Sequence, residues 1–164
     1  MLFCQNRHNT TAYVRRNGKT QRFTFPNSGM NKITLKNQTI APAVLVAERE
    51  PTSRTSLSEL LREEGYRVVE AADSSIAVAQ LNGDPSIRII LADLEMPSWT
   101  SIIRLARSRL PESFILGMLR YGALANAVEA QRLGAQAYLL KPLDFAEVNQ
   151  WIQRYLAGQS SIKI

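Results

Sequence analysis

IRIILADLEMP, residues 87–97, is a short apolar run that ends on a carboxylate and is followed by a turn. Its aliphatic residues do not alternate with polar ones, and Gly and Pro residues bound it, which is typical of a strand buried on both faces of a parallel sheet. Asp93 is then the last residue of that strand. In open parallel sheets, ligands bind outside the carboxyl ends of the strands. Asp93 is therefore the first candidate functional residue, although Asp also commonly ends a strand or caps a turn.

The chain around this stretch alternates between strand and helix patterns. The sequence predicts strands over residues 44–47, 66–71, 87–93, 114–119 and 137–140, and helices over 51–64, 74–82, 101–109, 125–133 and 145–156. Right-handed crossovers between parallel strands place helices on both faces of one sheet. The predicted fold class is therefore α/β, with a doubly wound, five-stranded parallel sheet.

Charge is distributed unevenly along the chain. Residues 1–40 contain seven of the 20 Lys and Arg residues and no acid, which leaves 13 basic against 14 acidic residues in 41–164. We predict a basic N-terminal extension over residues 1–40, flexible and with a hairpin at Asn17-Gly18, a folded domain over 41–158 and a C-terminal tail over 159–164. Nucleic-acid binding through the extension is also conceivable, but we consider it the weaker reading because the folded domain is nearly neutral.

Cysteine content and hydropathy indicate the compartment. Cys4 is the only cysteine, so no disulfide can form within the chain and a reducing compartment is permitted. No apolar run is long enough to span a membrane, and residues 1–40 lack the apolar stretch of a secretory signal. We expect a cytoplasmic protein without membrane contact.

Several motifs occur in a fixed order, and together they resemble the receiver domains of two-component response regulators. The matching segments are VLVAEREP at 44–51 with Arg54, GY at 65–66, DLEMP at 93–97, GA at 134–135 and YLLKP at 138–142. The resemblance covers about residues 43–156. It implies the flavodoxin-like receiver fold with strand order 2-1-3-4-5, and a cis bond between Lys141 and Pro142.

The resemblance also implies a functional site. Asp93 stands at the phosphoacceptor position, Lys141 at the position that binds the phosphoryl group and Tyr138 at the aromatic switch position. Family members hold Mg²⁺ with the acceptor Asp, an acid at the end of the first strand and a backbone carbonyl two residues after the acceptor. In this sequence the corresponding candidate metal ligands are Glu48, Asp93 and Glu95.

Two positions depart from the family pattern. Glu48 and Arg49 stand where the family has an acidic pair, so a guanidinium replaces the acid that binds the metal directly. Leu119 stands where the family has Ser or Thr. We expect Arg49 to bring a permanent positive charge into the metal position beside Lys141, and therefore expect a weak or absent Mg²⁺ site.

These observations predict a stand-alone receiver domain in phosphorelay signalling, because the chain ends at Ile164 and leaves no room for an output domain. We expect no enzymatic turnover, a sensor histidine kinase or another signalling protein as partner, and output by protein contact. A homodimer through the last two helices and the last strand is an open possibility. Two further functions stay open: a pseudo-receiver that binds partners without phosphorylation and, less favoured, a phosphatase with an aspartyl nucleophile.

Overall fold

The computed structural model describes residues 3–6, 9–16, 19–26 and 42–160, and the chain divides into two compact units, residues 1–39 and 40–164. In the smaller unit, β1 (Phe3–Asn6), β2 (Asn9–Arg16) and β3 (Lys19–Pro26) form an antiparallel sheet in the order β1-β2-β3. Arg16 pairs with Lys19 in the β2–β3 register, and the Asn17-Gly18 dipeptide between them lies outside the described residues.

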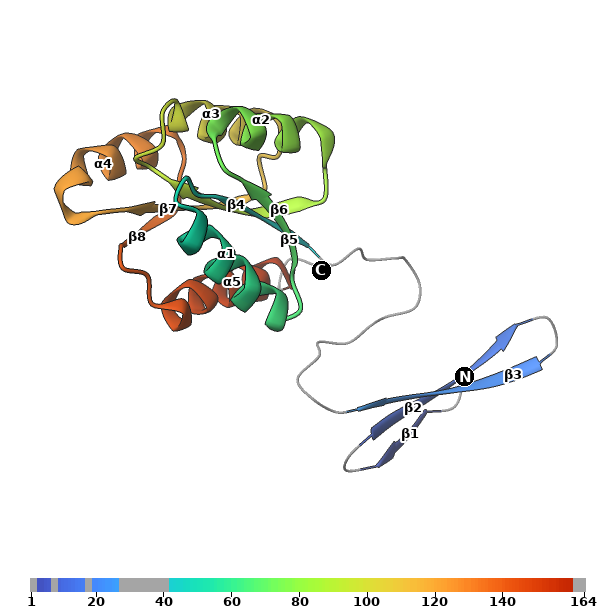
Figure 1. Cartoon of the computed structure of the whole chain (residues 1–164). Helices are drawn as coiled ribbons and strands as arrows, with labels where there is room; N and C mark the ends of the chain where they lie inside the picture. The colour runs from blue at the N-terminus through green and yellow to red at the C-terminus, as the bar shows by residue number, and fades with distance from the viewer. Residues whose placement is uncertain (1–2, 7–8, 17–18, 27–41, 161–164) are drawn as a thin grey trace. The chain divides into compact units, whose positions relative to one another are not determined.

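The larger unit is a doubly wound α/β domain (Figure 1). Its elements are β4 (Ala43–Ala47), α1 (Pro51–Glu63), β5 (Arg67–Ala71), α2 (Ser74–Gly83), β6 (Ile87–Asp93), α3 (Trp99–Arg109), β7 (Phe114–Leu119), η1 (Tyr121–Ala123), α4 (Leu124–Leu133), β8 (Ala137–Leu140) and α5 (Phe145–Ser160). The strands are parallel and lie in the order β5-β4-β6-β7-β8. This order confirms the predicted 2-1-3-4-5 topology.

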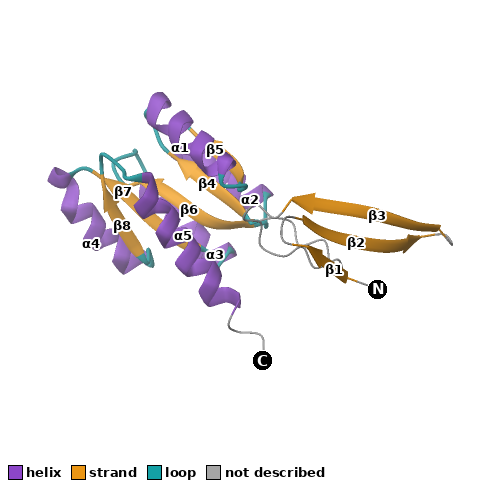
Figure 2. Cartoon of the chain, turned by 90° about the horizontal axis from the view of Figure 1, so that it is seen from below, coloured by secondary structure: helices purple, strands orange, loops and turns teal. Residues whose placement is uncertain are grey.

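Two hydrophobic cores form because the central strands are apolar on both faces. In β6, Ile90 and Ala92 pack into one core, while Ile89 and Leu91 pack into the other. Helices α2, α3 and α4 cover the first face, and α1 and α5 cover the second (Figure 1). Figure 2 shows α1 and α5 from the side of the sheet that they cover. A run of aliphatic residues without alternation, such as β6, is what a strand covered on both faces requires.

The ends of the elements differ from the sequence prediction by a few residues. Trp99, which we expected in the loop after Asp93, is the first residue of α3 and packs against the core under that helix. Helix α5 continues through Ser160, beyond the predicted end at 156. Leu60 and Ile76, apolar residues of the helices predicted over 51–64 and 74–82, are 38% and 39% exposed.

Tight packing fixes the backbone next to Asp93. Leu94 lies over Gly117 of β7, where an added Cβ would stand only 2.6 Å from Leu94 Cδ1. The Leu94 amide donates to the Met118 carbonyl at 2.8 Å, and Asn126 Nδ2 donates to the Leu94 carbonyl at 2.7 Å. Gly117 therefore allows the loop after Asp93 to rest directly on the neighbouring strand.

The described part of the chain contains no helix that is both long and apolar enough to cross a membrane.

Candidate functional site

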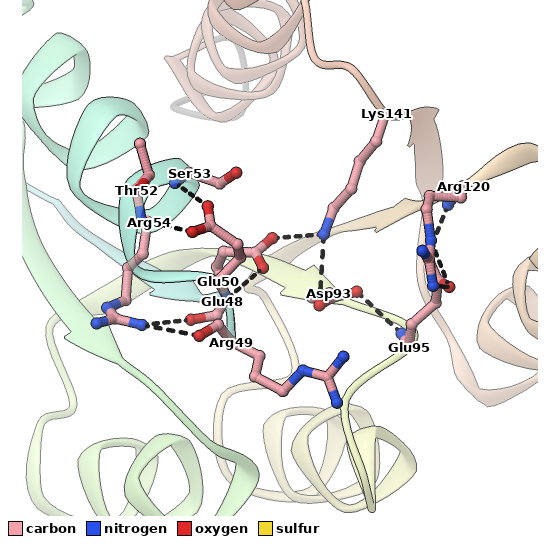
Figure 3. A network of polar contacts seen from close by, with 10 residues as sticks. All are labelled: Glu48, Arg49, Glu50, Thr52, Ser53, Arg54, Asp93, Glu95, Arg120 and Lys141. Carbon is pink, nitrogen blue, oxygen red and sulfur yellow. Dashed lines mark hydrogen bonds and ion pairs between the residues drawn. The ribbon is translucent and has the colours of Figure 1, made fainter.

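Asp93 and Lys141 meet at the carboxyl end of the sheet (Figure 3). Asp93 is the last residue of β6 and is only 4% exposed, and Lys141 directly follows β8. Lys141 Nζ lies 3.3 Å from Asp93 Oδ2, and the Glu95 amide donates to Asp93 Oδ1 at 3.0 Å. The Lys141–Pro142 bond is cis, as the resemblance implied. Each oxygen of the buried carboxylate thus has a donor as its partner.

Glu48 forms the second ion pair of Lys141. Its carboxylate is 2% exposed, and its Oε2 lies 2.6 Å from Lys141 Nζ. Its Oε1 accepts from the Glu50 amide at 2.9 Å. Arg54 Nη1 donates to the Glu48 and Arg49 carbonyls at 2.9 and 3.4 Å, which holds the turn between β4 and α1. The residue at the end of β4 is therefore a positioned acid, shared with Asp93 through one ammonium group.

Arg49 forms no ion pair with Asp93 in the part of the chain that the structure describes. We predicted two cations flanking Asp93, but the ion pair of Asp93 in the described residues is with Lys141. The Arg49 side chain is exposed, and in Figure 3 its guanidinium lies on the side of Asp93 away from Lys141. Arg49 is therefore an exposed cation beside the pocket and not an ion-pair partner of Asp93 in the described residues.

Leu119 and Tyr138 occupy the other two positions that the resemblance singled out. Leu119, at the end of β7, is fully buried in the core covered by α2, α3 and α4, and its carbonyl accepts from the Lys141 amide at 2.8 Å. It supplies no side-chain donor to the pocket. Tyr138, on β8, is 39% exposed. These two side chains are therefore not part of the polar network around Asp93.

Glu95 makes a contact that the sequence analysis missed. Its carboxylate binds Arg120, the residue that follows β7, through Arg120 Nε at 2.9 Å and Arg120 Nη2 at 2.6 Å. The Arg120 amide also donates to Glu95 Oε1 at 2.8 Å. Hydrogen bonding from Arg120 lowers the pKa of the Glu95 carboxyl. Opposite charges after two neighbouring strands were the signal in the sequence that could have revealed this pair.

Each of the three acids of the site forms an ion pair with a protein cation. Glu48 and Asp93 share Lys141, while the Glu95 carboxylate turns to Arg120. Among the residues that the structure describes, no group of three His, Cys, Asp or Glu side chains is placed to hold a metal. Glu48 and Asp93 are thus brought together around one ammonium group, while the Glu95 carboxylate, as distinct from the backbone carbonyl that the resemblance implied as a ligand, is engaged by Arg120.

Comparison with known proteins identifies the family. The model of the response regulator receiver domain matches residues 44–153. Response regulator protein FleR of Pseudomonas aeruginosa is 33% identical over 122 residues, which cover 73% of this chain and 26% of that protein. Transcriptional regulatory protein ZraR of Escherichia coli K12 is 32% identical over 121 residues, which cover 73% of this chain and 27% of that protein. The chain thus spans about a quarter of the length of these relatives.

Solved structures show the same fold. A CheY-like receiver domain protein from Methanospirillum hungatei superimposes with a TM-score of 0.68 at 24% identity, covering 73% of this chain and 97% of that one. The receiver domain of sensor histidine kinase PA1611 from P. aeruginosa was solved with a magnesium ion in its active-site cleft. It superimposes with a TM-score of 0.64 at 26% identity, covering 71% of this chain and 98% of that one. Receiver domains typically bind Mg²⁺ and are signalling modules rather than enzymes. With its parallel sheet, its Asp93–Lys141 pair and these relatives, the chain belongs to the response regulator receiver domain family of two-component signalling.

Proposed function

We propose that Asp93 accepts a phosphoryl group from a phosphohistidine of a sensor histidine kinase. The observation that supports this most directly is the position of its carboxylate, at the end of the central strand and 3.3 Å from the Lys141 ammonium. The Glu95 amide engages Oδ1, so Oδ2 is the oxygen that lies beside Lys141 and attacks phosphorus. An ammonium beside that oxygen stabilises the charge that develops on the phosphoryl oxygens.

The transfer balances without a further reactant. An oxygen of the Asp93 carboxylate forms a bond to phosphorus, and the bond between phosphorus and the imidazole nitrogen breaks. The electron pair of that bond returns to the imidazole, and Asp93 becomes a mixed anhydride. With a small acyl phosphate as donor, the carboxylate of the donor leaves instead.

The site is a degenerate one, and we propose that it reacts slowly. Lys141 divides its charge between Glu48 and Asp93, Arg49 replaces an acid, and Leu119 offers no hydroxyl. We expect Arg49→Asp to raise the rate of labelling by acetyl phosphate in the presence of Mg²⁺, because it returns an acid to the pocket. Leu119→Thr restores only one hydrogen-bond donor and should do much less. A larger gain from Leu119→Thr than from Arg49→Asp would contradict this ranking.

A second candidate is a pseudo-receiver that binds its partners without phosphorylation. The observation in its favour is that each carboxylate oxygen of Glu48 and Asp93 already has a donor within the protein. Incubation with acetyl phosphate, followed by intact mass measurement, separates the two functions. A phosphoacceptor gains one phosphoryl group that the Asp93→Asn variant does not gain. A pseudo-receiver gains none while it still binds its signalling partner.

We propose that output occurs by protein contact through the face formed by η1, α4 and β8, with a second copy of the chain as one occupant. This face carries five exposed apolar side chains: Tyr121, Leu124, Val128, Tyr138 and Leu140. Exposed apolar patches mark interaction sites, and β8 is an edge strand of the sheet. Trp151 and Tyr155 of α5 are not available, since both stack on Phe114.

Light scattering tests this interface. Val128 is 69% exposed at the centre of α4, so Val128→Lys should not disturb folding but should shift a dimer to monomer. A monomeric wild-type chain in both the free and the phosphodonor-treated state would rule out the homodimer and leave a different protein as the occupant.

A further inference from the structure

Arg120 and Glu95 connect the two loops at the mouth of the Asp93 pocket. Glu95 follows β6 by two residues, and Arg120 directly follows β7. The two strands are neighbours, with Asp93 opposite Met118 in the register, so both loops border the Asp93 carboxylate. The guanidinium of Arg120 engages both carboxylate oxygens of Glu95, while its side chain remains 72% exposed (Figure 3). The pair is thus a well-formed but water-accessible contact beside the proposed phosphoacceptor.

The charge balance around Asp93 indicates that a phosphoryl group would need a second cation besides Lys141. Of the acids around the pocket, Glu48 and Asp93 both pair with Lys141, and Glu95 pairs with Arg120. Figure 3 also draws the exposed Arg49 guanidinium on the other side of Asp93 from Lys141. A phosphoryl group carries about −1.5 to −2 charges at neutral pH. Lys141 already serves two acids and could not neutralise that charge alone. The Asp93 charge acts on Arg120 and contributes to its raised pKa, after the larger contribution of the hydrogen bonds with Glu95.

We propose that Arg120 is a further phosphoryl-binding residue, which exchanges its Glu95 partner for a phosphoryl oxygen on Asp93. This inference rests on the proposed function of Asp93 as phosphoacceptor. An arginine suits the exchange because its planar fork binds carboxylate and phosphate oxygens with the same geometry. The exchange costs little because exposed ion pairs contribute little to stability, and water solvates the Glu95 carboxylate once it is released. In this way Arg120 supplies positive charge at a site where Lys141 already pairs with two acids.

The competing role for the same pair is a gate that closes the pocket. The two roles predict opposite results for one variant. If Arg120 binds the phosphoryl group, Arg120→Met lowers the rate at which acetyl phosphate labels the protein, by about tenfold for one lost charge-assisted contact. If the pair is a gate, Arg120→Met raises that rate. Glu95→Gln should raise the rate by about twofold to fivefold in either case, because it weakens the hold on Arg120.

A matched control is available on α4. Arg132 forms an exposed pair with Glu129, at 2.9 Å and with 74% exposure, on the helix rather than at the pocket mouth. Arg132→Met therefore removes the same charge from the same kind of pair and should leave the labelling rate unchanged. A rate in Arg120→Met equal to or above that of the wild type and of Arg132→Met would overturn the inference.

A measurement without transfer separates this inference from the proposed function. Inorganic phosphate is titrated into the full-length protein, and the amide of residue 120 is followed by NMR. We expect the Arg120 amide to shift in the wild type and the apparent affinity to fall at least about threefold in Arg120→Met but not in Arg132→Met. Absence of a shift in the wild type, or equal affinity in Arg120→Met, overturns the role of Arg120 whatever the labelling shows. If phosphate binds but acetyl phosphate does not label the protein, the proposed role of Asp93 as phosphoacceptor is wrong, while the role of Arg120 in binding an anion stands.

Discussion

Replacing Lys141 with Met should expose how strongly one ammonium holds two buried acids together. The Nζ atom lies 2.6 Å from Glu48 Oε2 and 3.3 Å from Asp93 Oδ2, and both carboxyl side chains are at most 6% exposed. Each acid would keep one backbone N–H, from Glu50 and Glu95, but its other oxygen would lose its partner. Two buried like charges would then face each other without the ammonium between them.

The magnitude follows from burial. Removing one partner of a buried ion pair costs about 3–5 kcal/mol. The Lys141 side chain is 22% exposed, so water reaches the site and reduces the loss to about 2–3 kcal/mol. Introducing Glu48→Gln into the Lys141→Met chain removes one of the two uncompensated charges. We therefore expect the double variant to be more stable than Lys141→Met by about 1 kcal/mol, although Glu48→Gln alone destabilises the wild type.

The free energy of unfolding in urea is measured for the wild type, the two single variants and the double variant. Arg132→Met is the control for the loss of an exposed ion pair, and it should lower the free energy of unfolding by less than about 0.5 kcal/mol. The account would be refuted if Lys141→Met unfolded at the same free energy as that control. Strict additivity of Lys141→Met and Glu48→Gln would equally show that the two side chains are not coupled through the ion pair.

Three further predictions concern the frame around the site. Gly117→Ala should destabilise the domain by about 1–3 kcal/mol, because its Cβ would stand 2.6 Å from Leu94 Cδ1, and Leu94→Ala should reduce that loss in urea unfolding. Glu50 caps α1 by accepting from the Ser53 and Thr52 amides, which lower the pKa of its carboxyl from 4.5 to about 2. The stabilisation from this cap is therefore complete above pH 4.5 and is lost as the pH falls toward 2. The difference in unfolding free energy between the wild type and Glu50→Gln should disappear over that range of pH. Removal of residues 1–29 should change the melting temperature by less than about 2 °C, because both cores are built from residues 43–156, and a drop of several degrees would mean that the segment contacts the domain.

The fold could be predicted because each element carries its own pattern. The apolar run of β6 required cover on both faces, and Gly65 and Gly134 adopt positive φ angles, +88° and +112°, at the ends of α1 and α4. Trp99 was misplaced since nothing in its local sequence separates a loop from the first turn of a helix. The exposure of Leu60 and Ile76 could not be predicted, because a helix pattern shows which residues share a face but not how far the partner elements extend over that face.

The site was less predictable than the fold because it depends on side-chain direction. Position in the sequence located Asp93, Glu48 and Lys141, and the ion pairs between them confirm that the three meet. Arg49 was assigned to the pocket by position alone, and its side chain is exposed and forms no ion pair with Asp93 among the described residues. The Glu95–Arg120 pair joins residues 25 positions apart on different loops, so only the order of the strands, and no local pattern, could indicate it.

The central claim is that Asp93 is the residue that carries the phosphoryl group. Incubation of the full-length protein with acetyl phosphate, reduction with borohydride and peptide mapping test it directly, because borohydride converts an aspartyl phosphate to homoserine. We predict homoserine at position 93 in the wild type and in Arg132→Met, with less in Arg120→Met. Homoserine at another acid, or none at position 93 under conditions that label a receiver domain with a complete acidic site, would contradict the claim.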